Sequence, residues 1–353
     1  MKVEKSLKYL ALWRICSTFA ARQTEVALIV KDNRIIRFVK DWILPIAMVL
    51  GALAYFVFVW LPLPPSVRSV FASSVSVVQP VLLAVMLFVS FCKVAPKDLR
   101  PRHWHLVLLM VQLGMFLAIS FVAMYFKEDT GTSILLQGAM LCLICPTATA
   151  AAVVTSKLGG DSGSIVTYTL MINVATSLLA PAIFPLVHPQ PNSNFVVASL
   201  LIMSHVFPLL VMPLLAAWAT RLWLPRIHEK ILSVPNLAFY IWAFSLALAI
   251  TVTTKSIVHS TIGVWYVFWL AVISLGCCIF QFIVGKQIGE RHGERICGGQ
   301  AFGQKNTVFI IWLGYTFLIP VTAVVGGFYS VWHNVINSWQ LYKKRKESQV
   351  AAR

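Results

Sequence analysis

The sequence alternates long apolar runs with short polar segments, and this pattern limits the possible folds more than any other feature. The runs are about 20 residues long, the length at which an α-helix crosses the hydrocarbon core of a bilayer. Hydrophobic residues make up 59% of the 353 residues and charged residues only 12%. A soluble domain needs more charge than this to cover its surface. The sequence therefore predicts an all-α polytopic membrane protein.

The apolar runs predict ten transmembrane helices in two five-helix units. The first unit is expected at 41–187 and the second at 195–341, with a linker at 188–194 between them. Because five is odd, the two units would lie in opposite orientations, as two inverted repeats. Basic segments flank them: a cytoplasmic tail at 342–353, and residues 1–40, which read either as a helix lying on the membrane surface or as a disordered leader.

The net charge of +17 reflects basic loops that orient the protein in the membrane, and it does not indicate a nucleic-acid partner. Of the 29 Lys and Arg residues, all but Arg68, Lys127, Lys255 and Lys305 lie in the termini and in alternate loops. Loops rich in basic residues stay on the cytoplasmic side. We therefore expect both termini in the cytoplasm and a multi-pass protein of the plasma membrane, the inner membrane in a bacterial cell, with the lipid bilayer as its surroundings.

Two apolar segments are interrupted by residues that break helices. One is Gly298 to Thr307, which contains three glycines, two glutamines, a lysine and an asparagine. The other is Cys145 to Thr149, where Pro146 removes a backbone donor. In lipid, a backbone opened in this way must be satisfied by protein, water or ligand. The sequence therefore predicts that helices four and nine are discontinuous and that their breaks line a site.

Several motifs resemble the bile acid:sodium symporter family over roughly 41–344. The segment Cys145-Pro146-Thr147-Ala148-Thr149-Ala150 is similar to the family's CPGGTA, and Leu179 to Phe184 and Ser330 to Asn334 resemble later family segments. Gln112 and Gln304 fall where the family places functional glutamines. Together, these segments are far more specific than any one of them.

The resemblance implies an arrangement and an activity. Spans one, two, six and seven would form a panel domain, and spans three to five and eight to ten a core domain. Spans four and nine would cross at their unwound centres. Family members carry organic anions such as bile acids, coupled to two sodium ions, and the substrate would lie between the two domains beside the crossing.

The sodium-binding residues that the resemblance implies are changed in this chain. The family uses an asparagine shortly after CPGGTA and an acidic residue of E-x-G-x-Q-N, and these positions read Ala152 and Gln300 here. The final asparagine of that motif has become Lys305. All twelve acidic residues fall outside the expected span interiors or at their edges. We therefore expect a degraded sodium site, although carbonyl, hydroxyl and amide oxygens alone can still hold sodium.

Lys305 has three interpretations. A lysine near the bilayer centre costs about 2.5 to 3.5 kcal/mol on insertion scales, so it is usually buried in protein with a partner. It can place a permanent cation where sodium would bind, or it can lose its proton during the cycle and couple transport to protons. The structural alternative is a pin on the carbonyls that the breaks free.

The candidate site residues form two sets. The substrate-binding candidates are Pro146, Thr147, Thr149, Asn173, Gln300, Asn306 and Thr307. The ion-coupling candidates are Gln112, Thr169, Gln300, Gln304 and Lys305. The face of span five that carries Thr169 and Asn173 can bind an ion or substrate, or can simply pack small residues between helices.

These observations predict a secondary active transporter of an organic anion, bile-acid-like or another carboxylate or sulfonate. It would work by alternating access, with coupling that is sodium-independent or linked to protons through Lys305. The alternatives are a sodium-coupled bile acid symporter with neutral ligands and a membrane receptor that binds without transporting. With no metal-ligand cluster and no nucleophile beside a base, we expect no enzyme activity and no cofactor, the coupling sodium or proton aside. The sequence does not fix the substrate or the oligomeric state.

Overall fold

A computed structural model describes residues 43–189, 194–234, 237–259 and 263–351. Within these ranges the chain is helical and has no β-strand, which confirms the all-α class. The basic segment predicted at 1–40 lies outside the described residues.

The chain divides into two units, Met1–Val49 and Leu50–Arg353. Of the first unit the structure describes only the opening turns of α3. All contacts discussed below lie within the second unit.

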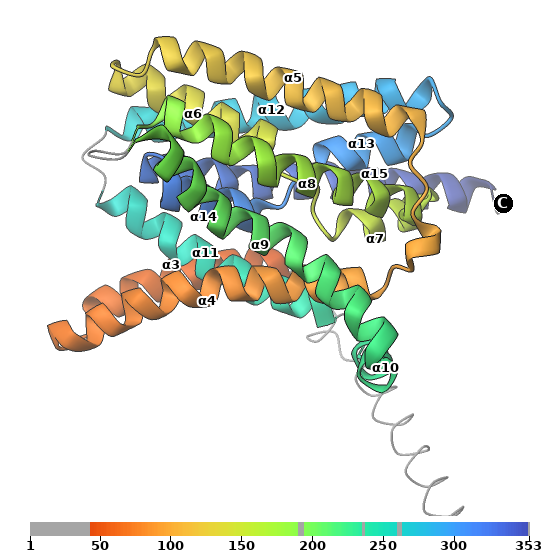
Figure 1. Ribbon diagram of the computed structural model, residues 1–353, viewed down its shortest axis with the longest axis horizontal. Helices are drawn as coiled ribbons and strands as arrows, with labels where there is room; N and C mark the ends of the chain where they lie inside the picture. The colour runs from red at the N-terminus through yellow and green to blue at the C-terminus, as the bar shows by residue number, and fades with distance from the viewer. Residues whose placement is uncertain (1–42, 190–193, 235–236, 260–262, 352–353) are drawn as a thin grey trace, which may run out of the picture. The chain divides into compact units, whose positions relative to one another are not determined.

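The helices of the chain are shown in Figure 1. In chain order the elements, with two short 3-10 helices labelled η, are α3 (Ile43–Trp60), α4 (Pro65–Cys92), η1 (Pro96–Asp98), α5 (His103–Tyr125), α6 (Thr130–Ile144), α7 (Ala151–Leu158), α8 (Ser162–Val187), α9 (Phe195–Trp223), α10 (Pro225–Ser233), α11 (Leu237–Val258), α12 (Val264–Glu290), α13 (Arg295–Gly303), α14 (Thr307–Phe317), η2 (Pro320–Ala323) and α15 (Val324–Ala351).

Six of the described helices are long and apolar enough to cross a membrane: those over Pro65–Cys92, His103–Tyr125, Ser162–Val187, Phe195–Trp223, Tyr240–Val258 and Val264–Glu290. Three more apolar helices are shorter. Two of these, α6 and α14, are short because the predicted breaks divide spans four and nine. The protein is thus a multi-pass membrane protein, while the full set of ten spans in two inverted repeats stays a prediction.

Aspartate side chains cap the starts of two helices beside the first break. Asp129 accepts a hydrogen bond from Gly131 N at 3.1 Å ahead of α6, and Asp161 accepts one from Gly163 N at 2.9 Å ahead of α8. Such caps satisfy backbone N–H groups that have no partner inside the helix. The hydroxyl of Thr132, hydrogen-bonded to Asp129, lowers the pKa of that carboxyl group. The caps fix where α6 and α8 begin.

The helices pack in a way that surrounds the breaks. The long helix α4 packs against α9 and α11, whereas α5, α6, α8, α12 and α15 pack against the short helices α7, α13 and α14 (Figure 1). A buried core joins Trp104 and Leu108 of α5, Tyr168 of α8 and Phe302 of α13. The division into a panel and a core domain stays a prediction.

The approach of α12 to α13 depends on facing glycines. A Cβ atom on Gly285 would collide with the carbonyl oxygen of Gly298, and one on Gly298 would collide with the carbonyl oxygen of Gly285. Only residues without a side chain permit backbones to lie this close. These two glycines therefore hold α13, and with it the second break, against α12.

Candidate functional site

The two interrupted segments meet and pair with each other. Thr147 and Lys305 form an isolated antiparallel bridge. Ala148 N donates to the carbonyl of Gln304 at 2.8 Å, and Asn306 N donates to the carbonyl of Pro146 at 2.9 Å. Both breaks lie where the helix-breaking residues predicted them, and each supplies the hydrogen bonds that the other has lost.

The last carbonyls of α6 are satisfied by side chains from three neighbouring helices. Gln112 on α5 donates through Nε2 to the carbonyls of Leu143 at 2.7 Å and of Cys145 at 3.1 Å. Two further donors complete the set: Thr176 Oγ1 to Ile144 O at 2.9 Å and Gln281 Nε2 to Cys142 O at 3.2 Å. All these donors are uncharged, so the end of α6 needs no cation to satisfy it.

The hydroxyl of Tyr168 holds Gln112 in place. It donates to Gln112 Oε1 at 2.7 Å, and both residues are fully buried. This bond fixes which end of the amide is oxygen, so Nε2 points toward α6. Gln112 therefore has the broken end of α6 as its partner on one side and Tyr168 of α8 on the other.

The end of α13 is satisfied in the same manner. Thr147 Oγ1 donates to the carbonyl of Ala301 at 2.6 Å, and the hydroxyl of Tyr329 donates to the carbonyl of Gly303 at 2.9 Å. Gln304 N continues the helix by donating to Gln300 O at 3.1 Å. Thr147 thus acts as a cap on the opposite broken helix.

Lys305 is fully buried at this crossing, with 0% of its surface exposed. Its amine has no hydrogen-bond partner among the described residues and lies 4.9 Å from the centre of the Phe302 ring. It does not cap the carbonyls of either break, so the structure gives no support to the interpretation of Lys305 as a pin. Four cysteine side chains lie within electrostatic reach of the amine: Cys142, Cys145, Cys277 and Cys278.

Among the side chains whose burial the structure describes, Lys305 is the only lysine, arginine, aspartate or glutamate that is buried. The electrostatic character of the crossing is therefore that of one ammonium group among uncharged donors and thiols. A cation–π contact with the Phe302 ring is one attraction toward it.

Other candidates lie near the crossing but have unused polar atoms. Asn306 caps α14 by accepting from Phe309 N at 3.3 Å, while its Nδ2 has no partner among the described residues. The same is true of further buried atoms: Thr307 Oγ1, Gln304 Oε1, Gln300 Oε1, and Nδ2 and Oδ1 of Asn173. Buried polar atoms without protein partners are sites where water or a ligand binds.

Some predicted candidates form their side-chain hydrogen bonds outside the crossing or lie at its edge. The hydroxyl of Thr169 donates to Ile165 O at 2.9 Å within its own helix. Gln300 Nε2 donates to Asn337 Oδ1 on α15 at 3.0 Å. Thr149 and Ala152 lie at the start of α7, half-buried rather than enclosed. Thr149 is therefore the candidate most accessible from outside the core.

Sequence analysis missed four residues that build the site: Tyr168, Gln281, Tyr329 and Asn337. Gln281 gave a usable signal, because it is a lone amide in an apolar segment, as Gln112 is. The tyrosines gave none, since a tyrosine in a span is as often a membrane-interface residue as a buried donor.

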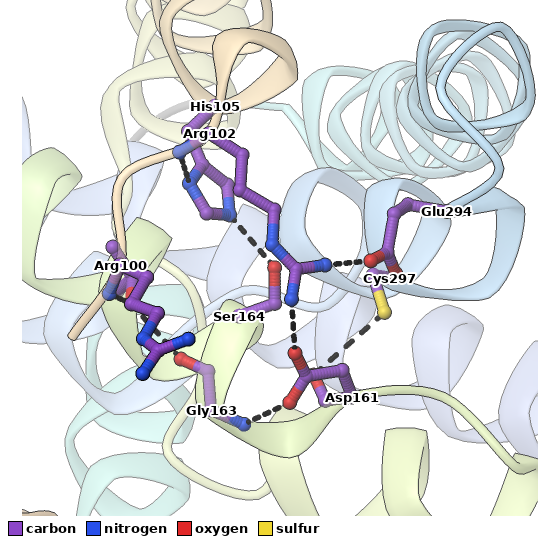
Figure 2. Close-up of polar contacts among 9 residues, drawn as sticks. Arg100, Arg102, His105, Asp161, Gly163, Ser164, Glu294 and Cys297 are labelled. Carbon is purple, nitrogen blue, oxygen red and sulfur yellow. Dashed lines mark hydrogen bonds and ion pairs between the residues drawn. The ribbon is translucent and has the colours of Figure 1, made fainter. Parts of the chain in front are cut away.

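A separate polar cluster joins the ends of α5, α8 and α13 (Figure 2). The guanidinium of Arg102 lies between Asp161, at 2.7 Å, and Glu294. Beside it, His105 is hydrogen-bonded to Ser164 at 2.9 Å. Because the ion pairs are partly exposed to solvent, each contributes only about 0 to 1 kcal/mol. The cluster connects the turn before α5, the turn between α7 and α8, and the turn before α13.

Residues 80–260 match the family model described as Sodium Bile acid symporter family. The match spans more than half of the 353-residue chain. It includes the first break and α5 through α11, which carry Gln112, Tyr168 and Asn173. No curated protein matches the chain.

Proposed function

The chain belongs to the sodium bile acid symporter family, and we propose that it is a secondary active transporter of an organic anion whose coupling depends on Lys305 rather than on sodium. The substrate would be a carboxylate or sulfonate, bile-acid-like or smaller. Both termini would lie on the cytoplasmic side of the plasma membrane, and transport would proceed by alternating access.

One observation carries this proposal: a lysine amine is fully buried at the crossing without a hydrogen-bond partner among the described residues. Burying a charged side chain in a membrane protein costs free energy. A lysine at this position is therefore expected to have a specific structural or functional role. A structural reason is not found, since Gln112, Gln281 and Thr176 already satisfy the end of α6. A functional role for the amine is therefore favoured.

The surroundings of the amine also argue against sodium. Sodium needs several oxygen ligands, and a carboxylate commonly neutralises its charge. The carbonyls of Cys142, Leu143 and Ile144 instead accept hydrogen bonds from side chains. Gln300, where the family motif has an acidic residue, is bonded to Asn337. The positive charge of Lys305 thus takes the place of a bound sodium ion.

Lys305 can serve coupling in two ways. As a permanent cation it would hold the crossing in one charge state, and transport would follow the substrate gradient alone. As a proton carrier it would gain and lose a proton in each cycle, which a lysine does readily once it is buried away from acidic groups. We favour proton coupling, because the groups that act electrostatically on the amine are cysteines, and no aspartate or glutamate is among the side chains described as buried.

The substrate is proposed to bind beside the crossing rather than on the amine. Lys305 is enclosed, whereas Thr149 and Ala150 at the start of α7 are partly accessible. Backbone N–H groups at a helix start attract anions. A carboxylate or sulfonate would therefore bind at the start of α7, near the hydroxyl of Thr149.

Transport assays in proteoliposomes test this function. Taurocholate is the first substrate to try, with sodium or potassium outside and with substrate counterflow as a second assay. The proposal expects counterflow, and uptake that is the same in sodium and potassium. Uptake that strictly requires sodium would instead indicate a symporter with neutral sodium ligands. Binding of taurocholate without exchange would indicate a receptor.

A further inference from the structure

One face of α15 carries buried polar side chains whose polar atoms lack partners. Ser330, His333 and Asn337 are three or four residues apart, so they lie on the same side of the helix. Ser330 Oγ, both ring nitrogens of His333 and Nδ2 of Asn337 have no hydrogen-bond partner in the part of the chain that the structure describes. Each buried polar group left unpaired costs about 1 to 3 kcal/mol. Several in a row therefore indicate that water satisfies them.

The end of this polar face that lies toward the start of α15 reaches the crossing. The hydroxyl of Tyr329 donates to the carbonyl of Gly303, directly before Gln304 and Lys305. Its ring meets the ring of His333 edge-on, with centroids 5.8 Å apart. The polar face of α15 therefore begins within two residues of the residue that carries the buried amine.

The other end of the polar face approaches the basic residues at the end of α15. Gln300 extends the polar face onto α13, with Nε2 bonded to Asn337 and Oε1 unpartnered among the described residues. One turn beyond Asn337, Gln340 Nε2 is a further buried atom without a described partner. The basic residues Lys343 to Lys346 follow immediately. Unpaired polar atoms thus extend from the crossing to the charged end of the helix.

We propose that Ser330, His333, Asn337 and Gln300 line a hydrated passage through which Lys305 exchanges protons with the solution at the basic end of α15. This inference rests on the proposed proton-coupled role of Lys305. Water in the passage would bond to the unpartnered atoms of Ser330, His333, Asn337 and Gln300. The passage would give one side of the membrane access to the amine while the rest of the crossing stays enclosed.

His333 is the residue suited to pass protons along this route. A neutral imidazole accepts a proton on one ring nitrogen and releases the proton from the other, and so ends uncharged in the opposite tautomer. Both nitrogens of His333 are free of described protein partners, which such a transfer requires. The titratable groups that neighbouring elements bring toward this part of α15 are Cys142, Cys277, Cys278, Lys286, Arg295 and Lys305, and α15 itself adds Lys343. None of them is a carboxylate that would trap the proton.

Cysteine labelling tests the passage without relying on transport. Ser330→Cys and Asn337→Cys would be exposed to a small charged methanethiosulfonate reagent, with the parent protein as the background for native thiols. Val335→Cys is the matched control, since Val335 lies on the same helix and is 60% exposed on its apolar side. Thiols react as thiolates, which form in water rather than in lipid, so we expect the two passage variants to react about tenfold faster than the control or more. Rates no faster than that of Val335→Cys would overturn the passage.

Transport by His333→Gln tests the proton step. Glutamine keeps hydrogen-bonding capacity but cannot carry a proton, so uptake driven by a proton gradient should slow while substrate counterflow is unchanged. His205→Gln is the control, because His205 is exposed and bonded to Leu201 O of its own helix. Gradient-driven uptake equal to that of the parent would contradict the role of His333.

The two tests separate this inference from the proposed function. If uptake by the parent ignores the proton gradient, the proposed coupling and the proton exchange both fail. If uptake follows the gradient but Ser330→Cys and Asn337→Cys stay unlabelled, only the passage fails.

Discussion

Thr147 and Lys305, which lie far apart in the sequence, pair as an antiparallel bridge where two helices are interrupted. The bridge lets each broken segment satisfy the backbone of the other, and glutamine, threonine and tyrosine side chains complete the hydrogen bonding. The backbone groups at these breaks are therefore hydrogen-bonded within the chain. The crossing also encloses the amine of Lys305.

Replacing Gln112 should destabilise the crossing. Gln112→Leu leaves the carbonyls of Leu143 and Cys145 and the hydroxyl of Tyr168 without their partner, so the free energy of unfolding should fall by about 1 to 3 kcal/mol. SDS titration in mixed micelles measures the change. Gln287→Leu is the control, because Gln287 is exposed on α12. Equal stability of the two variants would show that the cap contributes little.

The facing glycines should tolerate no side chain. In Gly298→Ala the new methyl group meets the backbone of Gly285, so α13 must move away from α12 at a cost of about 1 to 3 kcal/mol. Transport should fall with stability because α13 carries the second break. Gly276→Ala is the matched control, since a Cβ there meets nothing within 4 Å. If Gly298→Ala unfolds and transports like Gly276→Ala, the close approach of α12 and α13 is wrong.

The ion pairs in Figure 2 should contribute little to stability. A double-mutant cycle of Arg102→Gln and Glu294→Gln should give a coupling energy of about 1 kcal/mol or less, because the pair is partly exposed. The coupling should decrease further in high salt. A coupling of several kcal/mol that ignores salt would mean that the cluster is far more enclosed than its exposure indicates.

Lys305→Arg separates the two proposed forms of coupling. Arginine keeps the positive charge but does not release its proton. If Lys305 is a proton carrier, the variant should lose uptake driven by a proton gradient yet keep substrate exchange. If Lys305 is only a permanent cation, the variant should transport as the parent does. The measurement is gradient-driven uptake against counterflow in the same proteoliposomes.

Much of the fold follows from the sequence because local composition controls it. Long apolar runs specify membrane helices, and proline and glycine with polar neighbours specify the breaks, as at Pro146 and Gly303. The number of long spans was harder to predict, because a broken span yields only short helices such as α6 and α14.

The partners at the site could not be predicted in the same way. Which carbonyl receives Gln112, and that Tyr168 orients it, depends on how three helices cross. Thr169 looked equivalent to its neighbours on one face, yet its hydroxyl is bonded to Ile165 of its own helix. The sequence did predict that Lys305 would be buried, but the absence of a described partner for it depends on side chains from other helices.

The most direct test of the central claim is uptake under an imposed proton gradient, compared between the parent, Lys305→Asn and the exposed-lysine control Lys255→Asn. Asparagine restores the residue that the family motif has at position 305 and removes the fully buried amine. We predict that the parent and Lys255→Asn respond to the proton gradient and that Lys305→Asn does not. A response that survives in Lys305→Asn, or uptake by the parent that requires sodium, would contradict the role assigned to Lys305.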